Sequence, residues 1–336
     1  MHDNLDVGDP VPWLSQICAH SGKSFCLEAA GGRFTLFCLL GNGHNNSEQL
    51  QRVADRISHV VDNRGVILFL VVPDNQPEPY LHFQARNPGM RVMLDGEGTV
   101  RCAFAPLSPL DETIWYVFNP NLRIIFRRAF VSFSDSMNVI LDVSSYLPDL
   151  ADYGSGNPVP VIVIDSVLEK TLCSTLRAAH DQGANMASPL MVEKNGIIDY
   201  LHMPDIKRRV DSELPPVLLR QVHDRVIRRV VPEIQKVFQS SIDHIDRAVL
   251  GCYDSRDRGH FGMHRDNTQK ASHHRRYACS INLNDDYEGG YVGFPEYGNR
   301  VFRPGTGSAI IFSCSLLHLV TPVNAGRRYA VLLFLV

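Results

Sequence analysis

Several features that assign a chain to a protein class at once are scarce or missing in this sequence. No window of about 18 uninterrupted apolar residues occurs, so no transmembrane helix is expected. The N-terminal stretch MHDNLDVGDPVPWL is acidic and lacks the apolar core of a signal peptide. The net charge of −3 gives no basic excess of the kind that nucleic-acid-binding proteins have. Neither a membrane nor a nucleic acid is therefore an expected partner.

Paired cysteines are also missing, because none of the eight cysteines stands in a CxxC arrangement. Three of them, Cys38, Cys279 and Cys314, lie inside apolar runs. This usage is typical of reduced cysteines that serve as small core residues, and it predicts a cytoplasmic protein.

What is present favours two globular domains. The chain has 336 residues, of which 44 % are hydrophobic, enough for a sizeable core. Residues 1–150 hold 11 Lys and Arg against 16 Asp and Glu, whereas the remainder holds 22 against 20. The stretch LPDLADYGSGNPVP (147–160) is rich in Gly and Pro and has no apolar periodicity. We therefore predict one domain over 1–150 and a second over 158–336.

The N-terminal half alternates apolar runs with a helical pattern. Continuous apolar runs at 33–40 and 65–72 predict strands that are buried on both faces. Between them, 47–63 has apolar residues at helical spacing. Further strands are expected at 91–95, 114–120 and 122–131. Strand–helix–strand order predicts an α/β domain.

The C-terminal half begins with a strand and helices and then changes to short strands. A helix capped by Ser166 and an amphipathic helical region at 214–238 are expected first. From about residue 246, short apolar runs alternate with Gly, Pro and Asn turns to the end of the sequence. Such a pattern predicts a β-sandwich or barrel.

One constellation in this β-rich region suggests a metal site. His264 and Asp266 are two residues apart, so on a strand both side chains point to the same face. Of the later histidines, His273 and His274 lie in a basic stretch, whereas His318 lies inside an apolar run. Two histidines and one carboxylate form the facial triad of non-haem Fe(II) oxygenases. The alternatives are a surface strand with an unrelated core histidine, or a site at the second such pair, His244–Asp246.

Around these residues the sequence resembles the prolyl 4-hydroxylase-like branch of the 2-oxoglutarate/Fe(II)-dependent dioxygenases. The matching segments are GHFGMHRD (259–266), RYACSINLNDDYEGGYVGFPE (276–296), VFRPGTGSAIIF (301–312) and HLVTPVNAGRRYAV (318–331). The resemblance implies a double-stranded β-helix, or jelly roll, in an α+β domain. It also implies that His264, Asp266 and His318 hold Fe(II).

The same resemblance implies how 2-oxoglutarate is bound. Arg328 stands ten residues after His318, where the family has the basic residue that pairs with the far carboxylate of 2-oxoglutarate. Its neighbour Arg327 points to the opposite face of a strand. Tyr253 and Asn282 fall where relatives often contact the cosubstrate. Tyr253 can equally be a core aromatic, and relatives often have Tyr at the position of Asn282.

The implied activity is hydroxylation of a peptidyl or amino-acid-like C–H bond, a prolyl one among the candidates, with release of succinate and CO2. The implied cofactors are Fe(II), 2-oxoglutarate and O2, with ascorbate as a further candidate. Related halogenases lack the carboxylate ligand, so the presence of Asp266 favours hydroxylation. Two alternatives stay open: a non-catalytic interaction protein that uses both domains as a scaffold, and a cupin-like metalloenzyme without 2-oxoglutarate.

A local basic bias bears on the substrate. Residues 256–276 are rich in Arg, Lys and His. The bias suggests an anionic substrate, such as a peptide, a protein or a small amino-acid-like molecule, or else an acidic partner; the alternative is a solvated loop. Other arginines are expected on solvated helix faces, namely Arg208, Arg209, Arg225, Arg228 and Arg229.

The N-terminal half resembles a thioredoxin-fold domain of the peroxiredoxin type. The resemblance rests on the segments 5–14, 32–46, 95–104 and 114–131. In peroxiredoxins a reactive Cys follows the first core strand, at a helix start that lowers its pKa. Here that place reads GNGHNNSEQ and has no Cys. We therefore expect no peroxidase chemistry; the domain either recruits a partner or substrate or is a packing scaffold.

Overall fold

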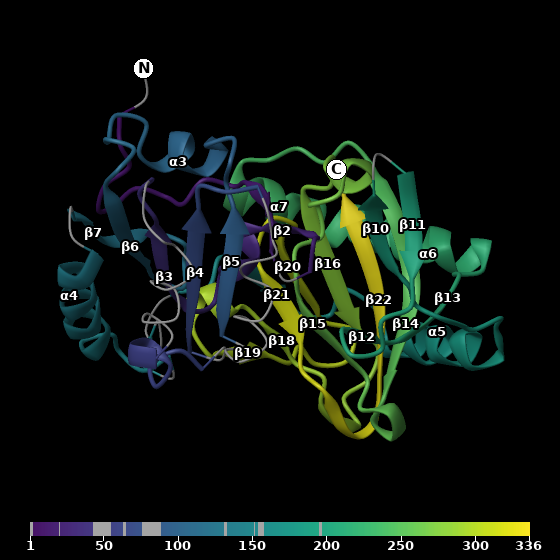
Figure 1. Cartoon of the computed structure of the whole chain (residues 1–336). Helices are drawn as coiled ribbons and strands as arrows, with labels where there is room; N and C mark the ends of the chain where they lie inside the picture. The colour runs from purple at the N-terminus through teal and green to yellow at the C-terminus, as the bar shows by residue number, and fades with distance from the viewer. Residues whose placement is uncertain are drawn as a thin grey trace. The chain divides into compact units, whose positions relative to one another are not determined.

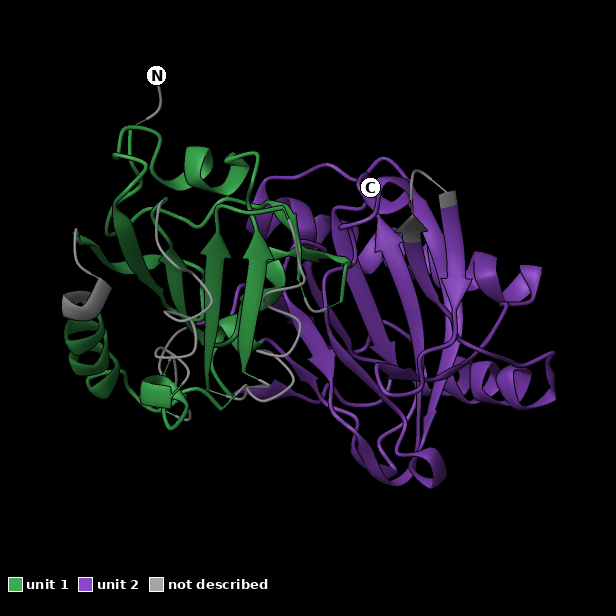
Figure 2. Ribbon diagram, viewed as in Figure 1, with its two compact units in different colours: residues 1–157, 295–299 green, residues 158–294, 300–336 purple. Residues whose placement is uncertain are grey.

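A computed structural model describes the chain over residues 3–19, 21–42, 55–62, 65–75, 89–130, 133–150, 152–153, 158–194 and 197–336. The chain divides into two compact units, one of residues 1–157 with 295–299 and one of residues 158–294 with 300–336 (Figure 2). Among the described residues, no helix is both long and apolar enough to cross a membrane.

The first unit is built on a five-stranded mixed sheet of order β5-β4-β3-β6-β7 (Figure 1). Strands β3, β4 and β5 run parallel, and β6 and β7 are antiparallel to their neighbours. The strands span β3 Phe34–Leu39, β4 Val66–Val72, β5 Met90–Leu94, β6 Thr113–Phe118 and β7 Ile124–Phe130. The remaining elements are β1 Ser15–Ile17, β2 Ser24–Cys26, η1 Leu27–Ala30, α3 Thr99–Phe104 and α4 Phe133–Ser145.

Apolar runs in the sequence explain this sheet. Every residue of β3 is buried, since alternate side chains enter two separate hydrophobic cores. Leu36 and Cys38 belong to one core and Phe37 and Leu39 to the other. The predicted α/β thioredoxin-like fold is therefore confirmed. The predicted helix 47–63 lies largely outside the described residues.

The second unit contains two sheets. The larger has the order β8-β20-β16-β22-β14-β13-β9, with β17 also paired to β22. Its strands span β8 Val161–Ile164, β9 Met186–Ala187, β13 Val210–Ser212, β14 Ile245–Asp254, β16 Tyr277–Asn282, β17 Tyr287–Gly289, β20 Ala309–Ser313 and β22 Val323–Leu335. Adjacent strands of this sheet are antiparallel.

The smaller sheet has the order β12-β15-β21-β18-β19. Its strands span β12 Lys207–Arg208, β15 His260–His264, β18 Val292–Gly293, β19 Val301–Phe302 and β21 His318–Val320. Phe312 on β20 contacts His318 on β21, and Tyr253 on β14 packs with Val320, so the two sheets meet face to face. This confirms the predicted jelly roll.

Helices cover the opposite face of the larger sheet. They span α5 Lys170–Gln182, α6 Pro216–Arg229 and α7 Val231–Phe238 (Figure 1). Their apolar side chains share one core with Tyr329, Val331 and Leu333 of β22. Because side chains alternate along a strand, Arg328 and Ala330 point away from this core, toward the smaller sheet. The remaining elements of the second unit are the hairpin β10 Leu190–Lys194 and β11 Ile197–Leu201 and the short helices η3 Ser255–Asp257 and η4 Lys270–Ser272, whereas η5 Pro295–Tyr297 belongs to the first unit.

One detail of the helical predictions was wrong, and another is now resolved more finely. Helix α5 begins at Lys170 and its N-cap is Glu169, because Ser166 adopts a left-handed conformation (φ 57°) in the preceding turn. The region 214–238 is two helices that meet at Val230. Pro232 lies in the first turn of the second helix, where it cannot continue the hydrogen-bond ladder of the first.

Candidate metal centre

Two adjacent strands bring the predicted ligands together. On the paired strands β15 and β21, His264 is the direct cross-strand partner of His318. Asp266 lies two residues beyond the end of β15, in a turn that is held by a 2.9 Å hydrogen bond from its N–H to the carbonyl of Cys314. The prediction that strand alternation orients Asp266 was therefore wrong, although the carboxylate does point at both imidazoles.

The three side chains form a compact group. The Nε2 atoms of His264 and His318 each lie 3.4 Å from one oxygen of Asp266. One ligand atom from each residue lies within 4.8 Å of the others, and this is the one group of three or more His, Cys, Asp or Glu with such spacing in the described part of the chain. Two nitrogens and one oxygen on one side leave room for further ligands, as in the facial triad.

Backbone carbonyls fix the orientation of both imidazoles. The Nδ1 atom of His264 is 2.8 Å from the carbonyl of Gly262, and Nδ1 of His318 is 3.0 Å from the carbonyl of Leu316. Since a carbonyl only accepts, each Nδ1 donates and each Nε2 keeps its lone pair for a metal. Metal-binding histidines are typically oriented in this way.

Local electrostatics favour the protonation states that a metal needs. Burial raises the pKa of Asp266, but the imidazoles of His318 and His264 outweigh burial and bring it to about 2. Burial, followed by the proximity of His264, lowers the pKa of His318 to about 4. Near neutral pH the site therefore presents a carboxylate and a neutral imidazole.

Aromatic rings line the site. The ring of Phe261 stacks on His264 with centroids 3.5 Å apart, and the ring of Phe312 lies 4.6 Å from that of His318. These rings restrict the imidazoles to one orientation and reduce the access of water.

Arg328 is buried on the face of β22 that looks toward the smaller sheet. Only 1 % of the residue is exposed. Its Nε and Nη2 atoms donate to Oδ1 of Asn282 at 3.1 and 2.9 Å, and Nη2 also donates to Ser280 at 3.1 Å. The remaining nitrogen, Nη1, is buried and has no hydrogen-bond partner. A buried guanidinium with no carboxylate and an unused donor indicates a missing anion.

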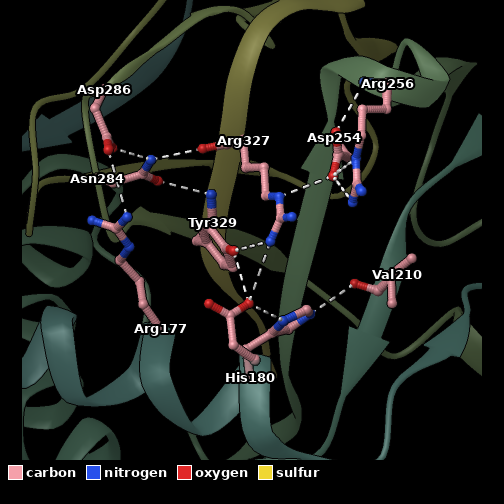
Figure 3. A network of polar contacts seen from close by, with 10 residues as sticks. Arg177, His180, Val210, Asp254, Arg256, Asn284, Asp286, Arg327 and Tyr329 are labelled. Carbon is pink, nitrogen blue, oxygen red and sulfur yellow. Dashed lines mark hydrogen bonds and ion pairs between the residues drawn. The ribbon is translucent and has the colours of Figure 1, made fainter.

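The neighbouring Arg327 has the opposite environment. Its side chain is 44 % exposed, and its guanidinium pairs with Asp254 at 3.0 Å and donates to the hydroxyl of Tyr329 at 3.2 Å. Figure 3 shows this polar network, in which Asn284 also accepts a 2.8 Å hydrogen bond from the N–H of Tyr329. The two arginines therefore face opposite sides of the strand.

The other two predicted cosubstrate residues lie beside Arg328. Tyr253 is its cross-strand partner on β14, and the guanidinium carbon lies 5.5 Å from the centre of the tyrosine ring. Asn282 accepts from Arg328 and donates to the hydroxyl of Tyr287 at 2.9 Å. Asn282 thereby orients the guanidinium that faces the site.

Sequence reasoning missed Ser280 and Tyr287. Ser280 lies two residues before Asn282 on β16, so strand alternation places both on one face. That alternation in CSINLN was the available signal. Tyr287 had no such signal, because its contact with Asn282 depends on the turn between β16 and β17.

The second His-x-Asp pair has a structural environment. Asp246 pairs with Arg275 at 2.8 Å and lies 3.3 Å from Nε2 of His274. Among the described residues, no further carboxylate, Cys or His joins His244 and Asp246 in a cluster of metal-binding geometry. The charge of Asp246 is thus neutralised by residues of the basic segment 256–276.

Much of that basic segment is engaged within the fold. Arg256 pairs with Asp254 at 2.6 Å, and Arg265 donates to the carbonyl of Ser315. The expectation that Arg208 and Arg209 lie on a solvated helix face was wrong. Arg208 is on strand β12, and Arg209 follows it and pairs with Asp211 at 2.5 Å.

Comparison with known proteins agrees with this geometry. Residues 249–336 match the profile of the 2OG-Fe(II) oxygenase superfamily. A PKHD-type hydroxylase of Azoarcus is 32 % identical over 87 residues, which is 24 % of this chain and 38 % of the relative. The C-terminal region is therefore a 2OG-Fe(II) oxygenase domain. The match spans well under half of the length of that relative.

Solved structures resemble each part of the chain. A viral collagen prolyl hydroxylase from Paramecium bursaria Chlorella virus-1 is 17 % identical with a TM-score of 0.40, covering 53 % of this chain and 97 % of the viral one. A peroxiredoxin Q of Xanthomonas campestris is 13 % identical with a TM-score of 0.33, covering 39 % of this chain and 89 % of the other.

Proposed function

We propose that the C-terminal unit is a 2-oxoglutarate- and O2-dependent Fe(II) hydroxylase that acts on a peptidyl or amino-acid-like C–H bond. The observation that carries the proposal is the pairing of a three-ligand cluster with a buried arginine whose Nη1 has no partner. A cupin-like metalloenzyme without 2-oxoglutarate has no use for that arginine.

The residues fit the groups they would hold. His264, Asp266 and His318 would bind Fe(II) through two neutral Nε2 atoms and one carboxylate, and Arg328 would bind the far carboxylate of 2-oxoglutarate through Nη1. When bound, these groups supply an oxidation in which 2-oxoglutarate and O2 yield succinate, CO2 and a hydroxylated product.

The protein's own contribution is orientation and exclusion of water. Asn282 and Ser280 hold Arg328 in one rotamer through its other donors, so that Nη1 is already directed when the cosubstrate arrives. Phe261 and Phe312 cover the imidazoles. Asp266 keeps a carboxylate in the triad, which favours hydroxylation over halogenation.

The test is mass spectrometry of a cell extract incubated with the Fe(II)-loaded protein, with and without 2-oxoglutarate. A product heavier by one oxygen atom that depends on 2-oxoglutarate, and is absent with the His318→Ala protein, supports the proposal. A wild-type protein that binds Fe(II) and 2-oxoglutarate but converts none of the extract favours the non-catalytic interaction protein instead.

For the N-terminal unit we propose that peroxidase chemistry has been lost. The segment 41–47 has no thiol, and Cys38 lies inside β3, where burial raises the pKa of its thiol well above the ordinary value. The full chain should therefore show no thiol-dependent peroxide turnover. Robust turnover that disappears in Cys18→Ser, Cys26→Ser or Cys38→Ser would contradict this.

A further inference from the structure

A cavity of about 770 Å³ lies in the second unit, and the three metal ligands are not among the residues of its wall. Its wall includes the end of α5, the segment that leads into β12 and β13, and the end of β14. Figure 3 shows part of this wall, with His180, Val210, Asp254, Arg256 and Arg327. Five cationic side chains line it, namely Lys207, Arg208, Arg209, Arg256 and Arg327.

Lys207 connects this cavity to the metal centre. It is the cross-strand partner of Phe261, and its ammonium lies 4.7 Å from the centre of that ring. The ring of Phe261 also stacks on the ligand His264. A group bound by Lys207 would therefore lie close to the reacting centre.

The arginines of the cavity have counter-ions. Arg209 pairs with Asp211 at 2.5 Å. Arg256 and Arg327 share Asp254 at 2.6 and 3.0 Å. Their charges are therefore largely neutralised within the fold.

Lys207 differs from these arginines. Its ammonium donates one hydrogen bond, of 3.1 Å, to the carbonyl of Pro189, and no carboxylate of the described residues lies within ion-pair distance. An ammonium has three donors, so two N–H groups remain available. Burial, and then the charge of Arg209, lowers the pKa of Lys207 to about 7.

We propose that Lys207 binds a carboxylate of the substrate, so that the hydroxylated molecule has an acidic group near the oxidised C–H bond. This inference rests on the proposed hydroxylase function and adds a substrate class to it. A purely structural role, anchoring the carbonyl of Pro189, needs one N–H and no open cavity. A carboxylate would supply the missing counter-ion and accept the free N–H groups.

The first test uses turnover. The full chain, loaded with Fe(II) and 2-oxoglutarate, is incubated with a peptide library in which one varied position holds Asp, Glu, Asn, Gln, Lys or Arg, and products heavier by one oxygen are sequenced by mass spectrometry. We expect acidic residues at a fixed offset from the oxidised residue to be enriched about tenfold over their amides. Amidated and free-acid C-termini distinguish a side-chain carboxylate from a terminal one.

Variants then assign the preference to Lys207. Lys207→Met should reduce the enrichment to about twofold or less, and Lys207→Glu should shift it toward Lys and Arg at the same offset. Arg208→Met, the neighbouring residue on β12, should keep the acidic preference. Melting temperature and Fe(II) content check that each variant is folded. Products without an acidic preference, or a preference that survives Lys207→Met, would overturn the proposal.

The second test needs no turnover, so it separates this inference from the hydroxylase proposal. Trace acetylation of the metal-free full chain, followed by peptide mass spectrometry, gives the labelling rate of Lys207. A pool of Glu-containing peptides at about twice its dissociation constant should slow that rate about threefold relative to the matched Gln pool. Labelling of the exposed Lys170 should not change. Equal protection by both pools would overturn the inference even if the enzyme hydroxylates peptides.

Discussion

Arg327 and Arg328 are adjacent on β22, yet they lie in different environments on the two faces of the strand. On the helix-side face, Arg327 has a carboxylate and a hydroxyl as partners and is half exposed. On the face toward the smaller sheet, Arg328 is buried with neutral partners only and has an unused donor. A satisfied network of this kind stabilises the fold, whereas a buried cation without an anion marks a place for a ligand.

The metal cluster should give the largest effect. His264→Ala or His318→Ala should reduce bound Fe(II) from one per chain to nearly none, because even outer-shell changes typically cost about 10- to 100-fold in metal affinity. Metal analysis after anaerobic loading and desalting measures this. His244→Ala, in the other His-x-Asp pair, is the matched control and should keep its iron. Wild-type iron in the His318→Ala protein would show that the site lies elsewhere.

The next largest effect should be a difference in 2-oxoglutarate affinity between variants of the two arginines. Arg328→Ala should weaken 2-oxoglutarate binding by about 30-fold to several-thousand-fold, because one side of a buried charge pair is removed. Arg327→Ala should change it by no more than about threefold, since an exposed pair contributes little. Titration of the anaerobic Fe(II) protein, followed by the metal-to-ligand charge-transfer band, gives both affinities. Equal losses would mean that the assigned faces of β22 are wrong.

The two asparagines of this region sharpen the comparison. Asn282→Ala removes the oxygen that accepts two hydrogen bonds from Arg328 and should weaken 2-oxoglutarate binding about 3- to 30-fold. Asn284→Ala breaks the network on the other face. It should lower the midpoint of urea unfolding and leave 2-oxoglutarate affinity nearly unchanged. The reverse pattern would contradict the separation of the two faces.

The smallest effect concerns pH and the metal-free protein. The pKa of His318 is about 4 in the folded chain, below its value of 6.5 when unfolded, so the unfolded chain takes up the proton first as the pH falls. The free energy of unfolding should therefore decrease by about 1–3 kcal/mol between pH 6.5 and pH 4 and be flat above pH 7. His318→Gln should flatten this dependence in urea unfolding series. An unchanged slope would show that His318 is not the cause.

Much of this arrangement could be predicted from the sequence because it depends on local alternation. Side chains on a strand alternate between its two faces. This alternation predicts that β3 is buried on both faces and that Arg327 and Arg328 point to opposite sides of β22. Spacing and resemblance together predicted His264 and His318 as metal ligands, and these two residues are direct cross-strand partners on β15 and β21.

Features that depend on distant contacts could not be predicted. Asp266 is oriented by a backbone hydrogen bond to Cys314, 48 residues away, and not by a strand. Arg209 is half-buried and pairs with Asp211, although its run of basic residues resembles a solvated surface. Helix α5 begins later than expected because Ser166 lies in a turn whose next residues contact the Gly307 carbonyl and Arg229.

Recognition of the distal carboxylate of 2-oxoglutarate by Nη1 of Arg328 is the central claim. The decisive measurement compares the dissociation constants of 2-oxoglutarate and of 2-oxobutyrate, which lacks that carboxylate, for the anaerobic Fe(II) forms of wild type, Arg327→Ala and Arg328→Ala. Wild type and Arg327→Ala should prefer 2-oxoglutarate by about 30-fold or more, and Arg328→Ala should show a preference of about threefold or less. An Arg328→Ala protein that keeps the wild-type preference would contradict the central claim.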